Sequence, residues 1–419
     1  MPLIGPLEDG LLLVPALVND QGPFVFAIDP DAHVSIIDED VLAATHAHTG
    51  EGPRLLDESD TERIRFFAEI LSWQLGTLTV KGPRPAQVVG KGTFDVDGRR
   101  IHGVIGRDII ADTLVFSFDR DAGVITFQTA SSFKPPAGAH SIAYSKLLSR
   151  IPNVETLPLP RRLATATIGA AKVAMHLDLG AKTSQLRYRS WQKAQLAESD
   201  ARVALSDEAG MVHTVKRRGV ARAVTVGDVT TRGVVFVPYV DRRWPDQDVE
   251  GTLGLDFFRP YAVTANWDDD TFYVAPRTGL QNVTARIGRW QSKTLTSCAS
   301  VGCAKISLID PLAGQPPETM PAKHPGVVVS IVREPSAKQL DLELLVAVTP
   351  AAGKESLDWL VANLPAGTDR AMMHLPAEYV GATLTVVDAS PFPRPCPGGG
   401  ACVDRFTAPQ PGGISQSGT

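Results

Sequence analysis

Short apolar runs alternate with turns rich in Gly, Pro and Asp along most of the chain, and few runs have helical spacing. The strand–turn–strand pattern is clearest at 113–127 and 261–275, where apolar residues alternate on both sides of a charged turn. Further strands are predicted at 326–332, 340–350 and 381–389. The pattern therefore predicts a mainly β protein.

An internal repeat divides the first two thirds of the chain into two similar halves. Asp29 and Asp178 each end an apolar run, FVFAID and AMHLD. Gly106 and Gly254 recur at almost the same offset, each in a Gly-x-Asp sequence that precedes one of the two hairpins. We therefore predict two β-rich lobes of about equal size.

The repeat and the turn residues set the expected domain boundaries. The first lobe is expected at 8–135 and the second at 158–278, joined by a Pro-containing linker at 136–157. A third, β-rich accessory domain is expected at 285–408. The tail 409–419 has no apolar pattern and is expected to be disordered.

The accessory domain contains one segment with the apolar spacing of a helix, KESLDWLVANL at 354–364, which we predict as helical. It also contains all the cysteines, in two local pairs with spacings C-x4-C and C-x5-C. They are Cys298, Cys303, Cys396 and Cys402. We expect disulfides, which close either two small local loops or one loop cluster stapled across, with free thiols as the alternative. Zinc is disfavoured because the C-x-x-C knuckles of zinc sites are absent. Disulfides indicate an oxidising compartment, either periplasmic or secreted.

Composition excludes several classes of function. The 419 residues include 41 Lys and Arg against 46 Asp and Glu, a net charge of −5 with no basic cluster, which argues against nucleic-acid binding. The apolar run at 11–18 is too short to span a membrane. It also contains Pro15 and follows two acidic residues, unlike a signal peptide.

The repeated aspartates predict acid–base chemistry. Two similar lobes that face each other would bring Asp29 and Asp178 close together. Two adjacent carboxylates cannot both ionise easily, so the pair holds one proton. The ionised member can take a proton from water while the protonated member polarises a carbonyl group, which is general acid–base hydrolysis.

The residues around these aspartates resemble the retropepsin-like aspartic proteases of clan AA, in particular bacterial members. Asp178–Ser184 (DLGAKTS) matches the family motif well, and Asp29–Ser35 (DPDAHVS) matches it in part. VIGRDII and TLGLDFF match the later family motif. The resemblance covers both lobes and implies two acid-protease barrels in a pseudo-dimer. It also implies an aspartic endopeptidase acting on peptides or proteins, without cofactor or metal and as a monomer.

The resemblance also implies which residues form the site. Asp29 and Asp178 would be catalytic, and the loops would consist of Pro30, Asp31, Ala32, Leu179, Gly180 and Ala181. Supporting roles would fall to Gly106, Asp108, Gly254 and Asp256. The strands around 57–66 and 206–214 would form flaps over a substrate.

Three loop positions depart from the family. Pro30 and Leu179 replace the Thr or Ser whose hydroxyl braces the paired loops, and neither side chain can form a hydrogen bond. Asp31 replaces a Gly that Gly180 retains, and it adds a third acidic group. The alternative is therefore an inactive pseudoprotease that binds an extended peptide or a protein partner between the lobes. A metal site at His46 and His48 is not predicted, because no third ligand is evident.

Overall fold

A computed structural model describes most of the chain. The described residues are 1–4, 11–32, 34–56, 62–95, 100–110, 114–148, 160–206, 212–239, 249–277, 284–286, 293–299, 302–312, 325–333, 342–349, 358–364, 370–375, 377–380, 382–390 and 402–407. The tail at 409–419, Cys396 and the predicted flap tips at 57–61 and 207–211 lie outside them.

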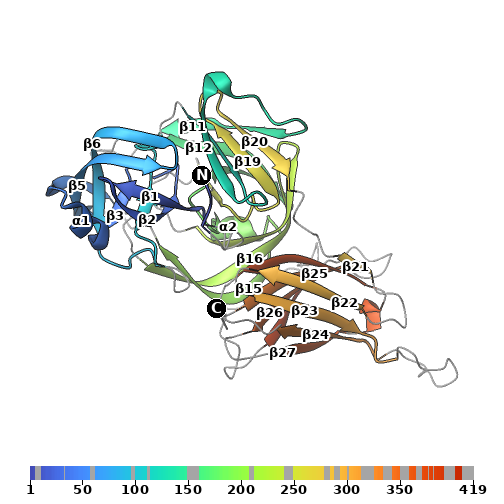
Figure 1. The fold of residues 1–419 in the computed structure, drawn as a ribbon. Helices are drawn as coiled ribbons and strands as arrows, with labels where there is room; N and C mark the ends of the chain where they lie inside the picture. The colour runs from blue at the N-terminus through green and yellow to red at the C-terminus, as the bar shows by residue number, and fades with distance from the viewer. Residues whose placement is uncertain are drawn as a thin grey trace.

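The first lobe is a closed barrel of six strands (Figure 1), in the order β1-β2-β7-β3-β6-β5, and it closes because β1 also pairs with β5. β4 lies outside the ring and forms a long hairpin with β5. The elements are β1 (Leu13–Val18), β2 (Gln21–Ile28), β3 (Ile36–Asp38), α1 (Glu39–Thr45), β4 (Thr49–Leu56), β5 (Glu62–Leu75), β6 (Leu78–Val89) and β7 (Gly103–Ile105).

The second lobe repeats this topology. Its barrel has the order β12-β13-β18-β14-β17-β16 and closes through β12 and β16, while β15 forms a long hairpin with β16 outside the ring. The elements are β11 (Ser145–Leu148), β12 (Pro160–Ile168), β13 (Ala171–Leu177), β14 (Ser184–Leu186), α2 (Tyr188–Trp191), β15 (Ala197–Ser206), β16 (Val212–Val226), β17 (Val229–Pro238) and β18 (Gly251–Leu253). The predictions of a mainly β protein and of two β lobes are thus confirmed.

One sheet joins the two lobes, in the order β10-β20-β19-β8-β9. Its central pair, β8 and β19, takes one strand from each predicted hairpin, and Pro2 bridges Val124 at the β9 edge. The strands are β8 (Leu114–Asp119), β9 (Val124–Thr129), β10 (His140–Ala143), β19 (Tyr261–Asn266) and β20 (Thr271–Pro276), with a 3-10 turn at Ala130–Ser132. The segment predicted as a linker therefore contributes β10 to this sheet and β11 to the second lobe.

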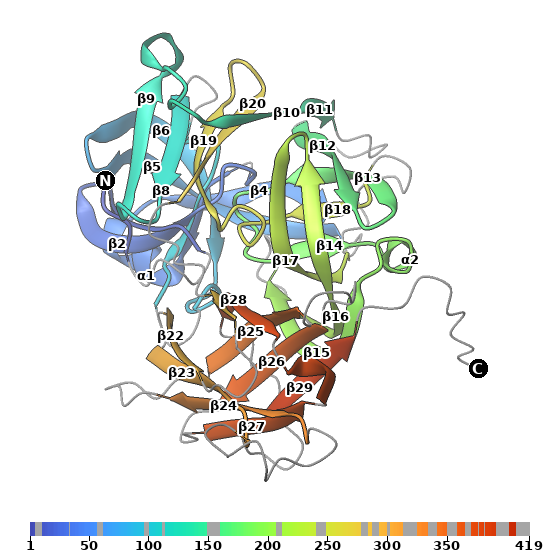
Figure 2. The same ribbon diagram turned by 90° about the vertical axis from the view of Figure 1, so that its right-hand side faces the viewer.

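The C-terminal region consists of two antiparallel sheets (Figure 2), β21-β28-β25-β26-β29 and β22-β23-β24-β27. The strands are β21 (Thr284–Arg286), β22 (Lys293–Ala299), β23 (Gly302–Ile309), β24 (Val327–Arg333), β25 (Leu342–Thr349), β26 (Asp358–Leu364), β27 (Arg370–Leu375), β28 (Thr383–Ser390) and β29 (Cys402–Thr407), and a 3-10 turn spans Ala377–Tyr379. β29 also contacts β15 of the second lobe (Figure 2).

The helix predicted at 354–364 is wrong over its described part, because residues 358–364 form β26. This strand is hydrogen-bonded on one side to β25 and on the other to β29. A short apolar run fits either a helix or a buried strand, and here pairing with two neighbouring strands decides the outcome.

Candidate active site

The two turns that carry Asp29 and Asp178 have equivalent positions in their barrels. Asp29 follows β2, and its backbone N–H donates to the carbonyl of Ile105 at the end of β7, at 3.0 Å. Asp178 follows β13, and its N–H donates to the carbonyl of Leu253 at the end of β18, also at 3.0 Å. Both strand pairs are parallel, so each aspartate stands at the carboxyl edge of its barrel.

Each aspartate also fixes its own turn. The Oδ1 atom of Asp29 accepts a hydrogen bond from the backbone N–H of Asp31 at 2.8 Å. The Oδ1 atom of Asp178 accepts one from Gly180 at 2.8 Å and another from Ala181 at 3.0 Å. These are Asx turns, in which a carboxylate is satisfied by the backbone two residues later.

A buried serine supports the turn in the first lobe. The Ser35 hydroxyl donates to Asp108 Oδ1 at 2.8 Å and accepts from the backbone N–H of Gly106 at 3.0 Å. Burial raises the pKa of Asp108 to about 6. Gly106 is required because a Cβ there would lie 2.8 Å from the carbonyl oxygen of Ala32.

The second lobe repeats this support. The Ser184 hydroxyl donates to Asp256 Oδ1 at 2.6 Å and accepts from the N–H of Gly254 at 3.0 Å. Asp108 and Asp256 therefore both brace their turns through a serine. Ser35 and Ser184 had no role in the sequence analysis, although each is the last residue of its motif and repeats with it.

The structure brings the two turns together across the lobes. One carboxylate oxygen from each of Asp29, Asp31 and Asp178 lies within 4.8 Å of the others. Gly180 allows this approach, because a Cβ at that position would overlap the carboxylate of Asp29. Asp31 occupies the equivalent position in the first lobe, where a side chain is present, and it lies close to Asp178.

An arginine and a histidine of the second lobe contact this third carboxylate, and a second arginine contacts the histidine. Arg162, on β12, forms an ion pair with Asp31. His176, on β13, places Nε2 3.4 Å from the same Asp31 oxygen and Nδ1 3.7 Å from Asp178 Oδ2. Arg161 donates from Nη1 to His176 Nδ1 at 2.9 Å. All three side chains are buried.

The surroundings shift the pKa values of Asp31 and Asp178 in opposite directions. Burial alone would raise the pKa of Asp31, but the Arg162 guanidinium and a hydrogen bond from His176 hold that pKa well below its usual range. Burial raises the pKa of Asp178, and the negative charge of Asp31 raises it further. Asp31 is therefore a fixed negative charge, whereas Asp178 favours its protonated form.

The positions of the expected hydroxyl brace are filled by buried apolar groups. Pro30 is buried, and Leu179 has an exposed fraction of 0% within the hydrophobic core. In the same two turns, Ala32 is buried and Ala181 is partly buried. Apolar packing thus replaces polar contacts at these two positions.

The sequence motifs did not predict a role for Arg161, Arg162 and His176, although the repeat contains a signal for them. β1 pairs with β2 through Leu13 opposite Ala27, and β12 pairs with β13 through Leu163 opposite His176. Ala27 is therefore the first-lobe counterpart of His176, and Leu12 is the counterpart of Arg162. Charged or polar residues in one lobe at positions that are apolar in the other indicate a special role.

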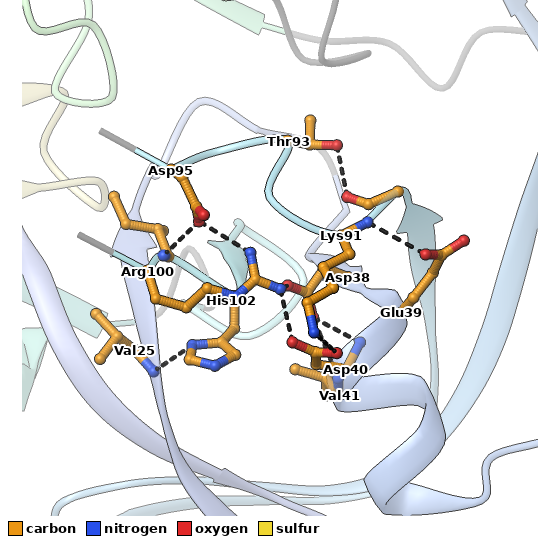
Figure 3. A network of polar contacts seen from close by, with 12 residues as sticks. Val25, Asp38, Glu39, Asp40, Val41, Lys91, Thr93, Asp95, Arg100 and His102 are labelled. Carbon is orange, nitrogen blue, oxygen red and sulfur yellow. Dashed lines mark hydrogen bonds and ion pairs between the residues drawn. The ribbon is translucent and has the colours of Figure 1, made fainter. Parts of the chain in front are cut away.

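A second polar network lies in the first lobe and is structural (Figure 3). Asp38 caps α1 by accepting from the backbone N–H groups of Asp40 and Val41. Arg100 forms ion pairs with Asp38, Asp40 and Asp95, so that it ties its own segment to the start of α1. These carboxylates are satisfied by Arg100 and by the helix start, and we assign them no chemistry.

The remaining predicted residues are only partly described. The backbone register places Cys298 opposite Cys303 in the β22–β23 hairpin, and Cys402 begins β29. The disulfides remain a prediction. His46 and His48 are exposed. In the part of the chain that is described, they do not belong to a group with metal-ligand spacing.

Two comparisons, with protein-family models and with curated protein sequences, give no match for the chain. No family model matches it, and no curated protein is similar to it in sequence. Neither α-helix among the described residues has the length and apolar character needed to cross a membrane. The repeated geometry of the two turns therefore carries the functional argument.

Proposed function

We propose that this protein is a retropepsin-like aspartic endopeptidase, with Asp29 and Asp178 as its catalytic dyad. The observation that carries this proposal is the convergence of two carboxylates from equivalent turns of two equivalent barrels. A peptide or protein is the expected substrate, and each hairpin that extends from a barrel, β4–β5 and β15–β16, is a candidate flap.

The electrostatics suggest a division of roles between the two carboxylates. Because burial and Asp31 raise the pKa of Asp178, this residue would hold the shared proton. Ionised Asp29 would then accept a proton from a water molecule as the water oxygen attacks the peptide carbonyl carbon. Asp178 would donate its proton to the carbonyl oxygen. As the tetrahedral intermediate collapses and the C–N bond breaks, Asp29 would pass its proton to the amine nitrogen, and a hydroxyl proton of the intermediate would return to Asp178.

The decisive experiment measures cleavage of a diverse peptide library from acid to neutral pH. Asp29→Asn and Asp178→Asn should each abolish cleavage, and a statine-type inhibitor should block the wild type. Asp20→Asn is the matched control, because Asp20 is exposed and has a positive φ of 60°, which Asn tolerates. Cleavage that survives both dyad substitutions would refute the assignment.

An inactive, peptide-binding pseudoprotease is the second candidate. Asp31 favours it, because a buried ion pair stands where active family members have only a glycine. A well-folded wild type that binds extended peptides without cleaving them, and whose affinity survives Asp178→Asn, would establish this alternative. The paired cysteines would place either protein in an oxidising compartment such as the periplasm.

A further inference from the structure

Asp31 and Arg162 form an ion pair that crosses from one lobe to the other. Asp31 belongs to the turn after β2, and Arg162 belongs to β12 of the second lobe. Their side chains are 8% and 3% exposed. An ion pair with so little exposure is costly to break, because the remaining charge would stay buried without a partner.

Arg162 is held in place by more than its partner. Its guanidinium carbon lies 4.0 Å from the ring centroid of Trp267, which follows β19 and is itself buried. A guanidinium stacked on an aromatic face is preorganised for directional hydrogen bonds. The cation therefore has a fixed position from which to bind the Asp31 carboxylate.

His176 links Arg161 to Asp31. A guanidinium can only donate, so Nδ1 of His176 accepts the hydrogen bond from Arg161. The other ring nitrogen, Nε2, lies 3.4 Å from Asp31 Oδ1. Asp31 thus contacts two residues of the second lobe, Arg162 and His176.

Asp31 is surrounded by several charged and titratable groups. Those that face it are Arg162, His176, Arg107, Tyr144, Asp29 and Asp178. Arg162 is the cation in direct contact with its carboxylate. Pairing with Arg162 keeps Asp31 ionised and leaves the proton to the dyad.

We propose that Arg162 and His176 are positioning residues, which bind Asp31 across the lobes and so replace the hydroxyl brace that Pro30 and Leu179 lack. This inference rests on the proposed protease function. It assigns to Asp31 the role of an anchor rather than of a third catalytic carboxylate. It also explains how a side chain is accommodated at the position equivalent to Gly180, since Arg162 and His176 stand where the first lobe has Leu12 and Ala27.

The test compares Arg162→Met with Arg162→Lys. Arg162→Met should lower kcat/KM at least 10-fold, mainly through kcat, and should move the pH optimum by at least one unit. Arg162→Lys keeps the charge, so its pH optimum should stay at the wild-type value and much of kcat should return. Arg189→Met is the matched control, because Arg189 is 51% exposed in its ion pair with Glu250. It should change neither quantity.

A second measurement does not depend on cleavage. Titration of ¹³C-labelled aspartate carboxyls should show one additional carboxyl that takes up a proton between about pH 5 and 8 in Arg162→Met. This carboxyl should be missing from the wild type and from the Asp31→Gly/Arg162→Leu double variant. A wild type that cleaves nothing would refute the proposed function, while the titration would still decide the pairing role.

Two outcomes would overturn the positioning role. One is an Arg162→Met variant whose pH optimum and carboxyl titration match those of the wild type. The other is an Arg162→Lys variant as impaired as Arg162→Met with the same shifted optimum, because the retained charge would then have no effect. If Arg162→Met fails to fold, Arg162→Gln, which removes the charge but keeps a polar side chain, takes its place in the carboxyl titration and should show the same additional carboxyl.

Discussion

The hydroxyl oxygens of Ser117 and Thr264 lie 2.9 Å apart at the centre of the sheet that joins the two lobes. These residues are directly opposite each other on β8 and β19, and each has the same place in its hairpin. They therefore mark the pseudo-twofold axis that relates the lobes. The same relationship brings the turns of Asp29 and Asp178 together, so packing of the lobes and formation of the site are one event.

This hydroxyl pair predicts energetic coupling between the lobes. Ser117→Ala and Thr264→Val should each lower the free energy of unfolding by about 1 kcal/mol, because one hydroxyl loses its partner. The double variant should lose less than the sum of the two, since neither hydroxyl then remains unpaired. Urea unfolding of the four proteins measures the coupling. Strict additivity would show that the hydroxyls do not interact.

Gly180 predicts a strong effect of a single methyl group. Because a Cβ at this position would overlap the Asp29 carboxylate, Gly180→Ala should displace Asp29 and abolish cleavage. The free energy of unfolding should fall by about 1–3 kcal/mol. Gly90→Ala, just after β6, is the control, since a Cβ there would only meet Thr93 Oγ1 at an ordinary contact distance of 3.8 Å. Equal activity and stability of the two variants would contradict the close contact.

Asp108 predicts a pH-dependent stability. Its pKa of about 6 exceeds the unfolded value, so its stabilising contribution is complete below about pH 4 and is lost as the pH rises through 6. Asp108→Asn remains neutral and still accepts from Ser35. The stability of this variant relative to the wild type should therefore increase by about 2–3 kcal/mol between pH 4 and 8. Thermal melts of the wild type and the variant across this range measure the change.

Much of this architecture could be predicted from the sequence because it is local or repeated. The hairpins at 113–127 and 261–275 show period-2 alternation, and the repeat of Asp and Gly residues pairs Asp29 with Asp178. The strand β26 was missed because its partners β25 and β29, rather than its own residues, determine its conformation.

The residues that surround the two catalytic aspartates could not be predicted from local sequence patterns. Arg162 and Asp31 are 131 residues apart in sequence, and only the folded lobes show that they pair. In the sequence, Asp31 indicated only an unusual acidic residue in the loop. Its partners Arg162 and His176 lie on β12 and β13, before the second motif, so the motif itself did not reveal them. A comparison of the two halves position by position would have revealed Arg162 and His176 as departures from an apolar pattern.

The Asp31–Arg162 ion pair predicts a large interaction energy between the two residues. Removing either partner alone should destabilise the protein, whereas removing both should cost much less. Arg162→Met leaves a buried carboxylate and Asp31→Gly leaves a buried guanidinium, so each should lower the free energy of unfolding by about 3–5 kcal/mol at pH 7.5. The Asp31→Gly/Arg162→Met double variant should recover most of that loss. Because Arg162 depresses the pKa of Asp31, the pair stabilises the wild type above about pH 4, the unfolded value. In Arg162→Met burial alone would raise that pKa, so this variant should lose less stability at pH 4.5 than at pH 7.5. A loss that is independent of pH, or additive in the double variant, would show that packing and not charge explains the contact.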